Sequence, residues 1–158
     1  MQSDKTLILG LGNDILSDDR IGPELVNDLS EILDNPGIKF ETASSGGLEL
    51  METIKDFKKV IIIDAIHTRD GKPGNVYYFR PSDFQETSHL SSLHDVDFLT
   101  AIKLGDKIGM NLTDDLHVIA VEILEDREFS EELTADLRQK YLSILKEVAT
   151  IVKGIMSR

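Results

Sequence analysis

Apolar residues occur along the chain in two patterns, short continuous runs and longer stretches with helical spacing. Short apolar runs are typical of strands covered on both faces, whereas apolar positions three and four residues apart indicate amphipathic helices. The two patterns alternate, which predicts an α/β fold built on a parallel sheet. Strands are predicted over residues 6–11, 38–43, 60–63, 76–79 and 116–123, and helices over residues 21–33, 48–54, 96–108 and 133–155.

The junction after the first predicted strand, residues 10–22, is rich in glycine and aspartate. Ligands of open α/β sheets bind beyond the carboxyl ends of the strands, so this junction is a candidate site. It contains Gly10 and Gly12 and an adjacent pair of carboxylates, Asp18 and Asp19. An aspartate before a helix accepts hydrogen bonds from free N–H groups, so we expect one of the pair to cap the following helix. A second carboxylate exceeds that need and indicates a cation or proton-transfer site.

The two glycines also suggest a nucleotide-binding loop. A dinucleotide fingerprint requires a third glycine three residues after the second, and this chain has Ile15 there. The neighbouring aspartates would repel a phosphate group. Nucleotide binding is therefore the weaker hypothesis, and we expect no nucleotide as a partner.

Two further junctions follow predicted strands. Gly46 and Gly47 precede the short helix, and the pair is explained either by a tight turn with positive φ or by close backbone approach to a bound chain. Asp64 follows the apolar run of residues 60–63 and is expected to end that strand. Its carboxylate either caps a turn or contributes chemistry at the carboxyl end of a central strand.

His94 directly precedes the helix predicted over residues 96–108. A helix N-terminus disfavours the imidazolium form, so a neutral ring could act there as a ligand or a base, although three other histidines compete for that role. Asp19, Asp64 and His94 each lie at a junction that the fold would bring to the same edge of the sheet. Two carboxylates and one imidazole suit a divalent first-row metal and leave coordination positions open.

Composition narrows the function further. The 158 residues are expected to form a single domain, residues 1–158, and the absence of cysteine excludes disulfides, thiolate metal sites and cysteine nucleophiles. A formal net charge of -12 would repel nucleic acids and anionic membranes, so we expect neither as a partner, and it favours a basic tail as substrate. The sequence shows no signal peptide and no membrane-spanning run, so we expect a cytoplasmic location.

Four segments, in this order, together resemble the hydrogenase maturation endopeptidases. They are Gly-Leu-Gly-Asn with Ser-Asp-Asp-Arg-Ile-Gly in residues 10–22, Ser-Gly-Gly-Leu-Glu-Leu in residues 45–50, Ile-Ile-Ile-Asp-Ala in residues 61–65 and Ser-Leu-His-Asp in residues 92–95. Members of this family remove a C-terminal extension from the large-subunit precursor of nickel-iron hydrogenases after nickel has been inserted. The resemblance implies a three-layer sandwich, in which helices cover both faces of a twisted, mostly parallel five-stranded sheet.

By this resemblance, Asp19, Asp64 and His94 match the metal-contacting residues of the family. Gly46 and Gly47 match part of a loop associated with substrate binding, although the usual Gly-Thr is absent here. Nickel would arrive in the substrate, so no permanently bound metal is expected, and the three ligands would test that insertion has occurred. Asp19 and Asp64 are the predicted catalytic residues, and the attacking water would be activated either by the nickel or by one of these carboxylates.

A second hypothesis is a non-catalytic maturation chaperone that binds nickel or the precursor. Such a protein would retain the three predicted metal ligands but would not cleave the precursor. Replacing Asp19 by asparagine separates the two hypotheses, because a protease loses cleavage and a chaperone has no cleavage to lose.

Overall fold

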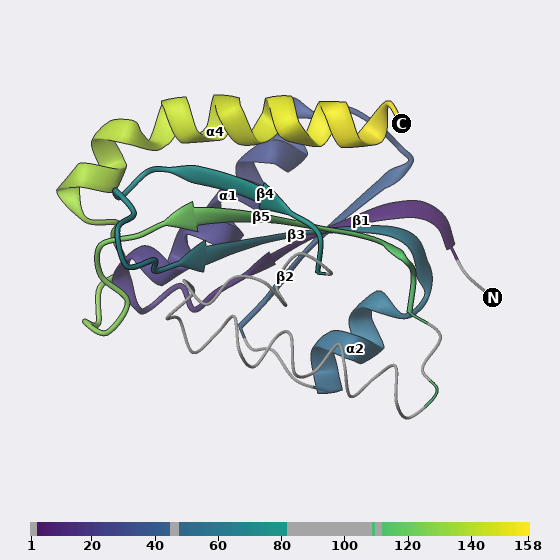
Figure 1. Cartoon of the computed structure of the whole chain (residues 1–158), viewed down its shortest axis with the longest axis horizontal. Helices are drawn as coiled ribbons and strands as arrows, with labels where there is room; N and C mark the ends of the chain where they lie inside the picture. Colours follow the sequence, from purple (N-terminus) through teal and green to yellow (C-terminus); the bar gives the residue numbers. More distant parts are fainter. Residues whose placement is uncertain (1–2, 45–47, 82–108, 110–111) are drawn as a thin grey trace.

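The computed structural model of the chain describes residues 3–44, 48–81, 109 and 112–158. Within these residues the helices and strands follow one another as the apolar pattern predicts (Figure 1). In chain order they are β1 (Ser3–Leu11), the 3-10 helix η1 (Ser17–Arg20), α1 (Ile21–Ile32), β2 (Ile38–Ala43), α2 (Leu48–Ile54), β3 (Phe57–Ile66), β4 (Val76–Phe79), β5 (Asp115–Glu122) and α4 (Ala135–Met156).

The strands form one open sheet with the order β2-β1-β3-β5-β4. Neighbouring strands are parallel except for β4, which lies at one edge and runs antiparallel to β5. From β1 the chain goes outward to β2 and then returns to β3 on the other side of β1. This reversal creates a topological switch point between β1 and β3, and α/β proteins bind their ligands at the carboxyl ends of the strands there.

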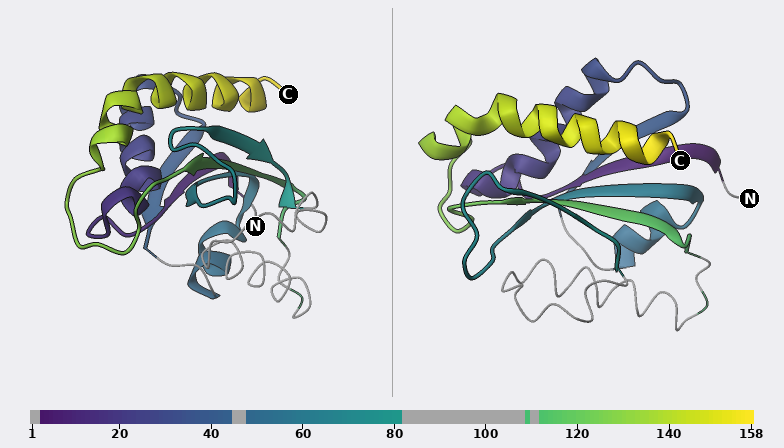
Figure 2. Two further views of the ribbon diagram at one scale, coloured as in Figure 1. Left: turned by 60° about the vertical axis from the view of Figure 1, so that its left-hand side comes forward. Right: turned by 45° about the horizontal axis from the view of Figure 1, so that its top comes forward.

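Helices cover both faces of the sheet, α1 and α4 on one face and α2 on the other (Figure 2). Successive side chains of a strand point to opposite faces, and β3 shows this alternation. Ile61 and Ile63 join the core that includes residues of α1 and α4, whereas Val60 and Ile62 join the core beneath α2. Because β3 is covered on both faces, its residues 60–66 are all buried. The predicted three-layer sandwich with a mostly parallel five-stranded sheet is confirmed.

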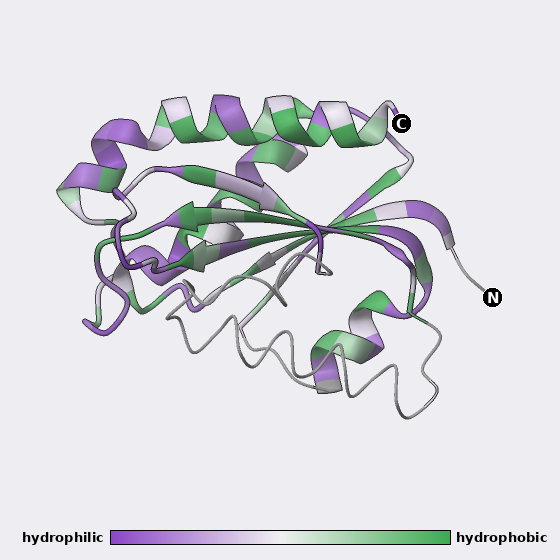
Figure 3. Ribbon diagram, viewed as in Figure 1, coloured by the Kyte–Doolittle hydropathy of each residue, from purple (hydrophilic) through white to green (hydrophobic). Residues whose placement is uncertain are grey.

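The C-terminal helix α4 packs along the sheet through one apolar stripe. In Figure 3 its hydrophobic positions lie on the side that faces the strands. The buried residues of the stripe are Leu137, Ile144, Leu145, Val148, Ala149, Val152 and Ile155.

None of the helices in the described part of the chain is both long and apolar enough to cross a membrane.

The predicted boundaries agree with the structure to within three residues, since β1 and β3 each begin three residues earlier than predicted. β2 and β4 match the prediction at both ends, and α1 ends one residue earlier than predicted. Asp64 does not end β3, because the strand continues to Ile66. Ala65 and Ile66 still pair with β5, so the ladder carries the strand past the carboxylate. The helix predicted over residues 96–108 lies outside the described residues.

Candidate active site

Glycines allow the junction after β1 to turn sharply into η1 and α1. Gly12 has φ +150°, and a Cβ atom there would overlap the backbone oxygen of Asp19. A Cβ atom on Gly10 would lie only 2.6 Å from the backbone oxygen of Gly22. The backbone at the start of the helix therefore packs directly on the end of β1, which only residues without a side chain permit. This close packing explains the glycines that had suggested a nucleotide-binding loop.

Asp19 lies within this turn, on η1. It is 0% exposed, and its Oδ2 accepts a hydrogen bond of 2.8 Å from the backbone N–H of Asn13. Two residues earlier, Ser17 has φ 43°, a left-handed conformation that residues other than glycine rarely adopt. Such a conformation costs about 1–3 kcal/mol and persists only where the surrounding structure enforces it, most often at functional sites. The strained turn therefore holds the Asp19 carboxylate at the carboxyl end of β1.

Neither aspartate of the adjacent pair caps α1, so that expectation is wrong. The N-cap residue of α1 is Arg20, and no side-chain cap hydrogen bond forms there. The reason is that both Asp18 and Asp19 lie within the 3-10 helix η1, which precedes α1 and keeps their side chains from its first free N–H groups.

Asp18 instead joins two segments that are distant in the sequence. Its fully buried carboxylate accepts hydrogen bonds from the backbone N–H groups of Leu124 (3.1 Å), Glu125 (3.0 Å) and Thr134 (2.7 Å), and from the Thr134 hydroxyl (3.0 Å). Thr134 is the N-cap residue of α4. The sequence indicated no such partners, because they lie more than one hundred residues away from Asp18.

Asp64 lies on β3, across the switch point from β1. It is 4% exposed, and its Oδ1 accepts a hydrogen bond of 2.8 Å from the N–H of Ala65. The carboxylate thus accepts a hydrogen bond from the next residue of the strand. Strand alternation places Asp64 on the same face as Ile62, which is the face covered by α2.

The start of α1 brings the segments of the two predicted catalytic aspartates together. A Cβ atom on Gly22 would overlap the backbone oxygen of Leu11 and lie 2.6 Å from that of Ile63. Gly22 therefore sits against the carboxyl ends of β1 and β3 at once. Because η1 also contacts β3, Asp19 and Asp64 belong to neighbouring segments at the switch point.

The remaining predicted site residues, His94, Gly46 and Gly47, lie outside the described residues. In the part of the chain that the structure describes, no group of three or more His, Asp or Glu side chains is arranged to hold a metal. The ligand set of Asp19, Asp64 and His94 therefore stays a prediction.

A fourth buried carboxylate, Glu122, was not singled out from the sequence. It ends β5 and accepts hydrogen bonds from the N–H of Thr68 (2.8 Å), the hydroxyl of Tyr77 (3.2 Å) and the hydroxyl of Thr68. A Cβ atom on Gly71 would overlap its Oε1. Through these hydrogen bonds, Glu122 holds the loop after β3 against the carboxyl edge of the sheet. The sequence feature that could have identified Glu122 was an acidic residue at the end of an apolar strand.

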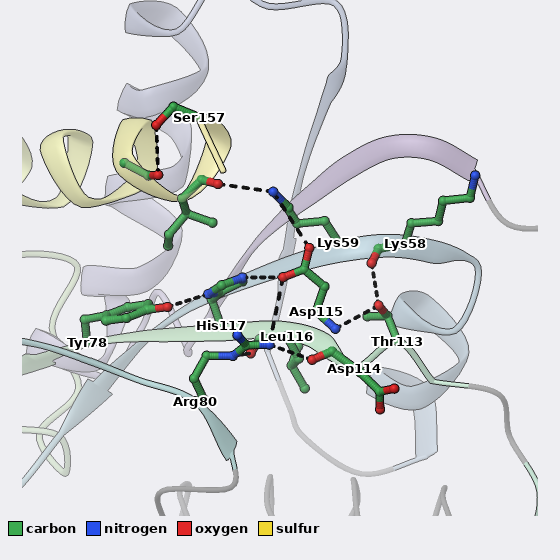
Figure 4. A network of polar contacts seen from close by, with 12 residues as sticks. Lys58, Lys59, Tyr78, Arg80, Thr113, Asp114, Asp115, Leu116, His117 and Ser157 are labelled. Atoms are coloured by element: carbon green, nitrogen blue, oxygen red, sulfur yellow. Dashed lines mark hydrogen bonds and ion pairs between the residues drawn. The ribbon is translucent and has the colours of Figure 1, made fainter.

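The buried histidine His117 belongs to a different polar network (Figure 4). Its Nδ1 lies 2.6 Å from the hydroxyl of Tyr78, and its Nε2 lies 2.6 Å from Asp115. The Asp115 carboxylate also pairs with Lys59 (3.7 Å) and Arg80 (3.9 Å). Burial lowers the pKa of His117 below its ordinary value. This network lies at the amino ends of β3 and β5, opposite the candidate active site, so His117 has a structural role.

Comparison with known proteins gives consistent matches. The family model described as hydrogenase maturation protease matches residues 23–151. The hydrogenase 2 maturation protease of Escherichia coli strain K12 is 27% identical over an alignment 114 residues long, and the match covers 69% of this chain and 70% of that protein. The solved structure of the hydrogenase maturating endopeptidase HybD from E. coli superposes with a TM-score of 0.75 at 24% identity, covering 95% of this chain and 93% of HybD.

A second solved structure agrees in fold. The nickel-iron hydrogenase maturation protease HybD from Thermococcus kodakarensis has a TM-score of 0.74 at 22% identity, and the match covers 93% of this chain and 98% of that one. The family model spans far more than half of the sequence. The chain therefore belongs to the hydrogenase maturation protease family, and as a member it is a peptidase with a role in the processing of hydrogenase.

Proposed function

We propose that this protein is the endopeptidase that removes the C-terminal extension of a nickel-iron hydrogenase large-subunit precursor once nickel has been inserted. The observation that carries the proposal is the placement of two buried carboxylates, Asp19 and Asp64, on neighbouring segments at the topological switch point. The family match begins at residue 23, so the role of Asp19 rests on this placement and on the motif around it.

Nickel enters this proposal as part of the substrate. Carboxylate oxygens together with an imidazole form a donor set that suits a divalent first-row ion. Asp19, Asp64 and His94 would complete the coordination of the ion that the precursor presents, so a precursor without nickel would lack the main recognition element. Gly46 and Gly47 would border the bound precursor chain.

The chemistry requires a water, a base and an oriented peptide bond. Binding through the ion would fix the scissile bond next to the carboxylates, and such positioning lowers the entropic part of the barrier. We propose aspartic-type activation, in which one of the two carboxylates takes a proton from the water that attacks the carbonyl carbon. The same proton then passes to the amide nitrogen of the leaving C-terminal peptide.

The experiment incubates the purified protein with a nickel-loaded hydrogenase precursor and follows the precursor by intact mass. We expect loss of one discrete C-terminal peptide, no loss from nickel-free precursor, and no loss with Asp19→Asn or Asp64→Asn. The matched control is Asp14→Asn, since Asp14 lies on the same loop with an exposed side chain.

Two results would contradict the proposal in different ways. Cleavage at the wild-type rate by both Asn variants would remove the aspartates from the reaction. An unchanged mass in the presence of wild-type protein, combined with stable binding of the precursor, would instead favour the non-catalytic chaperone.

A further inference from the structure

We propose that Ile15, Leu124 and Phe129, named here the apolar rim, form a docking surface beside the candidate active site. The occupant that we assign to it is an apolar segment of the hydrogenase precursor flanked by basic residues. This inference rests on the proposed function, because it names a second contact between the same enzyme and the same substrate.

The rim is unusual because large hydrophobic side chains are concentrated and exposed there. The exposed fractions are 46% for Ile15, 56% for Leu124 and 82% for Phe129. Single exposed hydrophobic residues are common on protein surfaces, but a group of them indicates an interaction site. All three belong to the two loops at the carboxyl edge of the sheet; residues 123–134 form the green loop at the left of Figure 1.

Backbone pairing joins two members of the rim. Leu16 and Ser130 form a parallel β-bridge, in which Ser130 donates to the oxygen of Ile15 (3.0 Å) and Ser17 donates to the oxygen of Ser130 (3.1 Å). Ile15 and Phe129 each precede a bridged residue by one position. This pairing places the backbones of Ile15 and Phe129 side by side in the two loops.

The third member is held by the turn that holds Asp19. The N–H of Leu124 donates to Asp18, whose own N–H donates to the oxygen of Glu125 (2.9 Å). The rim is therefore built on hydrogen-bonded backbone adjacent to a predicted catalytic residue. A surface that is ordered before binding loses little conformational entropy when its partner docks, which favours affinity.

Charge identifies the chemistry of the partner. The carboxylate of Glu125 accepts hydrogen bonds from the N–H groups of Arg127 (2.6 Å) and Glu128 (3.1 Å), which lowers the pKa of Glu125 and keeps it ionised. An acidic border around an apolar centre favours a partner with the opposite charge around its own apolar residues. The acidic border comprises Glu125, Asp126, Glu128, Glu131 and Glu132, and Arg127 is the only lysine or arginine within residues 123–134. From outside this loop, Arg138 pairs with Glu132 (3.5 Å) and Arg20 donates to the backbone oxygen of Glu131.

The same charge argues against a second copy of this chain as the occupant. A symmetric dimer through the rim would place the same acidic loop of each copy against that of the other. With a formal net charge of -12 per chain, the electrostatic part of this contact would be repulsive. The precursor segment is therefore the better partner.

The test truncates the rim and leaves the predicted catalytic residues in place. We expect the double variant Leu124→Ala/Phe129→Ala to raise KM for nickel-loaded precursor by about tenfold or more, the size of effect typical of interface anchors. The kcat at saturating precursor should stay close to the wild-type value. Leu142→Ala is the matched control, because Leu142 is 78% exposed on α4 and belongs to neither loop.

Binding measurements separate this inference from the proposed function. In the Asp64→Asn background, calorimetry should show the same loss of affinity for precursor on rim truncation, and higher salt should weaken binding to the intact rim. If wild-type protein cleaves precursor and truncation leaves KM unchanged, the inference is overturned and the proposed function stands. If no cleavage occurs, equal affinities of intact and truncated protein overturn the inference separately. Sedimentation that shows a dimer lost on truncation, with precursor binding unchanged, would assign the rim to self-association and also overturn it.

Discussion

Replacing Asp18 by asparagine tests whether this buried carboxylate holds the turn of the candidate active site to the start of α4. The substitution keeps the size of the side chain, removes its charge and exchanges one acceptor oxygen for an NH2 donor. Four donors face the carboxylate: Thr134 N–H at Oδ1, and the N–H groups of Leu124 and Glu125 and the Thr134 hydroxyl at Oδ2. In either orientation of the amide, the NH2 group therefore faces at least one donor.

The expected change in the free energy of unfolding follows from the amide orientation that keeps the most hydrogen bonds. With the amide oxygen at the Oδ2 position, three hydrogen bonds survive with a neutral acceptor, and the Thr134 N–H is left buried against an NH2 group. A hydrogen bond to a charged group contributes about 1.5–3 kcal/mol, and a buried unsatisfied donor costs about 1–3 kcal/mol. We expect Asp18→Asn to lower the free energy of unfolding by about 2–4 kcal/mol. With a urea m-value of about 2 kcal/mol/M, the midpoint falls by about 1–2 M.

The assay is urea unfolding followed by circular dichroism, since the chain has no tryptophan to report unfolding by fluorescence. Asp14→Asn is the control, because it makes the same chemical change at an exposed position of the same loop, and its effect should stay within about 0.5 kcal/mol. Equal midpoints for Asp18→Asn and wild type would refute the structural role assigned to this carboxylate.

Three further predictions concern stability. Gly71→Ala should lower Tm by about 5 °C, because the new Cβ displaces the buried Glu122 carboxylate; an unchanged Tm in a thermal scan would contradict the packing of that loop. Burial lowers the pKa of His117, so near pH 6 the unfolded chain binds a proton more readily than the folded protein does. Stability should therefore fall as pH drops below about 6.5, and His117→Gln should weaken this dependence in urea unfolding at about pH 7.5 and 5.5. Burial and the hydrogen bond to Asp28 raise the pKa of Tyr141, so this hydroxyl should stay protonated at alkaline pH. Tyr141→Phe removes the hydrogen bond and should lower the free energy of unfolding, measured in urea, by about 1 kcal/mol.

The fold was predictable because its signals are local. The buried run at residues 60–63 identifies a central strand without knowledge of its neighbours, and Pro36 with Gly37 marks the end of α1. The continuation of β3 past Asp64 was missed because pairing of Ala65 and Ile66 with β5, rather than their own propensity, extends the strand.

The candidate site was predictable only in part. Asp19 and Asp64 could be placed at one sheet edge from chain order, since each follows a predicted parallel strand. The roles of Asp18 and Glu122 could not, because their hydrogen-bond partners come from segments whose positions depend on the whole fold. The sequence shows that both residues are acidic, but it does not distinguish a buried carboxylate that accepts structural hydrogen bonds from one that takes part in a reaction.

The hydrogen bonds between Asp18 and Thr134 join residues 116 positions apart. Contacts of such high sequence separation form late in folding, because a long loop must be closed before they can stabilise anything. During synthesis, the turn that contains Asp19 emerges early but lacks these partners until residues 124–134 have left the ribosome. A nascent chain therefore carries this turn for most of its synthesis without the hydrogen bonds that join it to the start of α4.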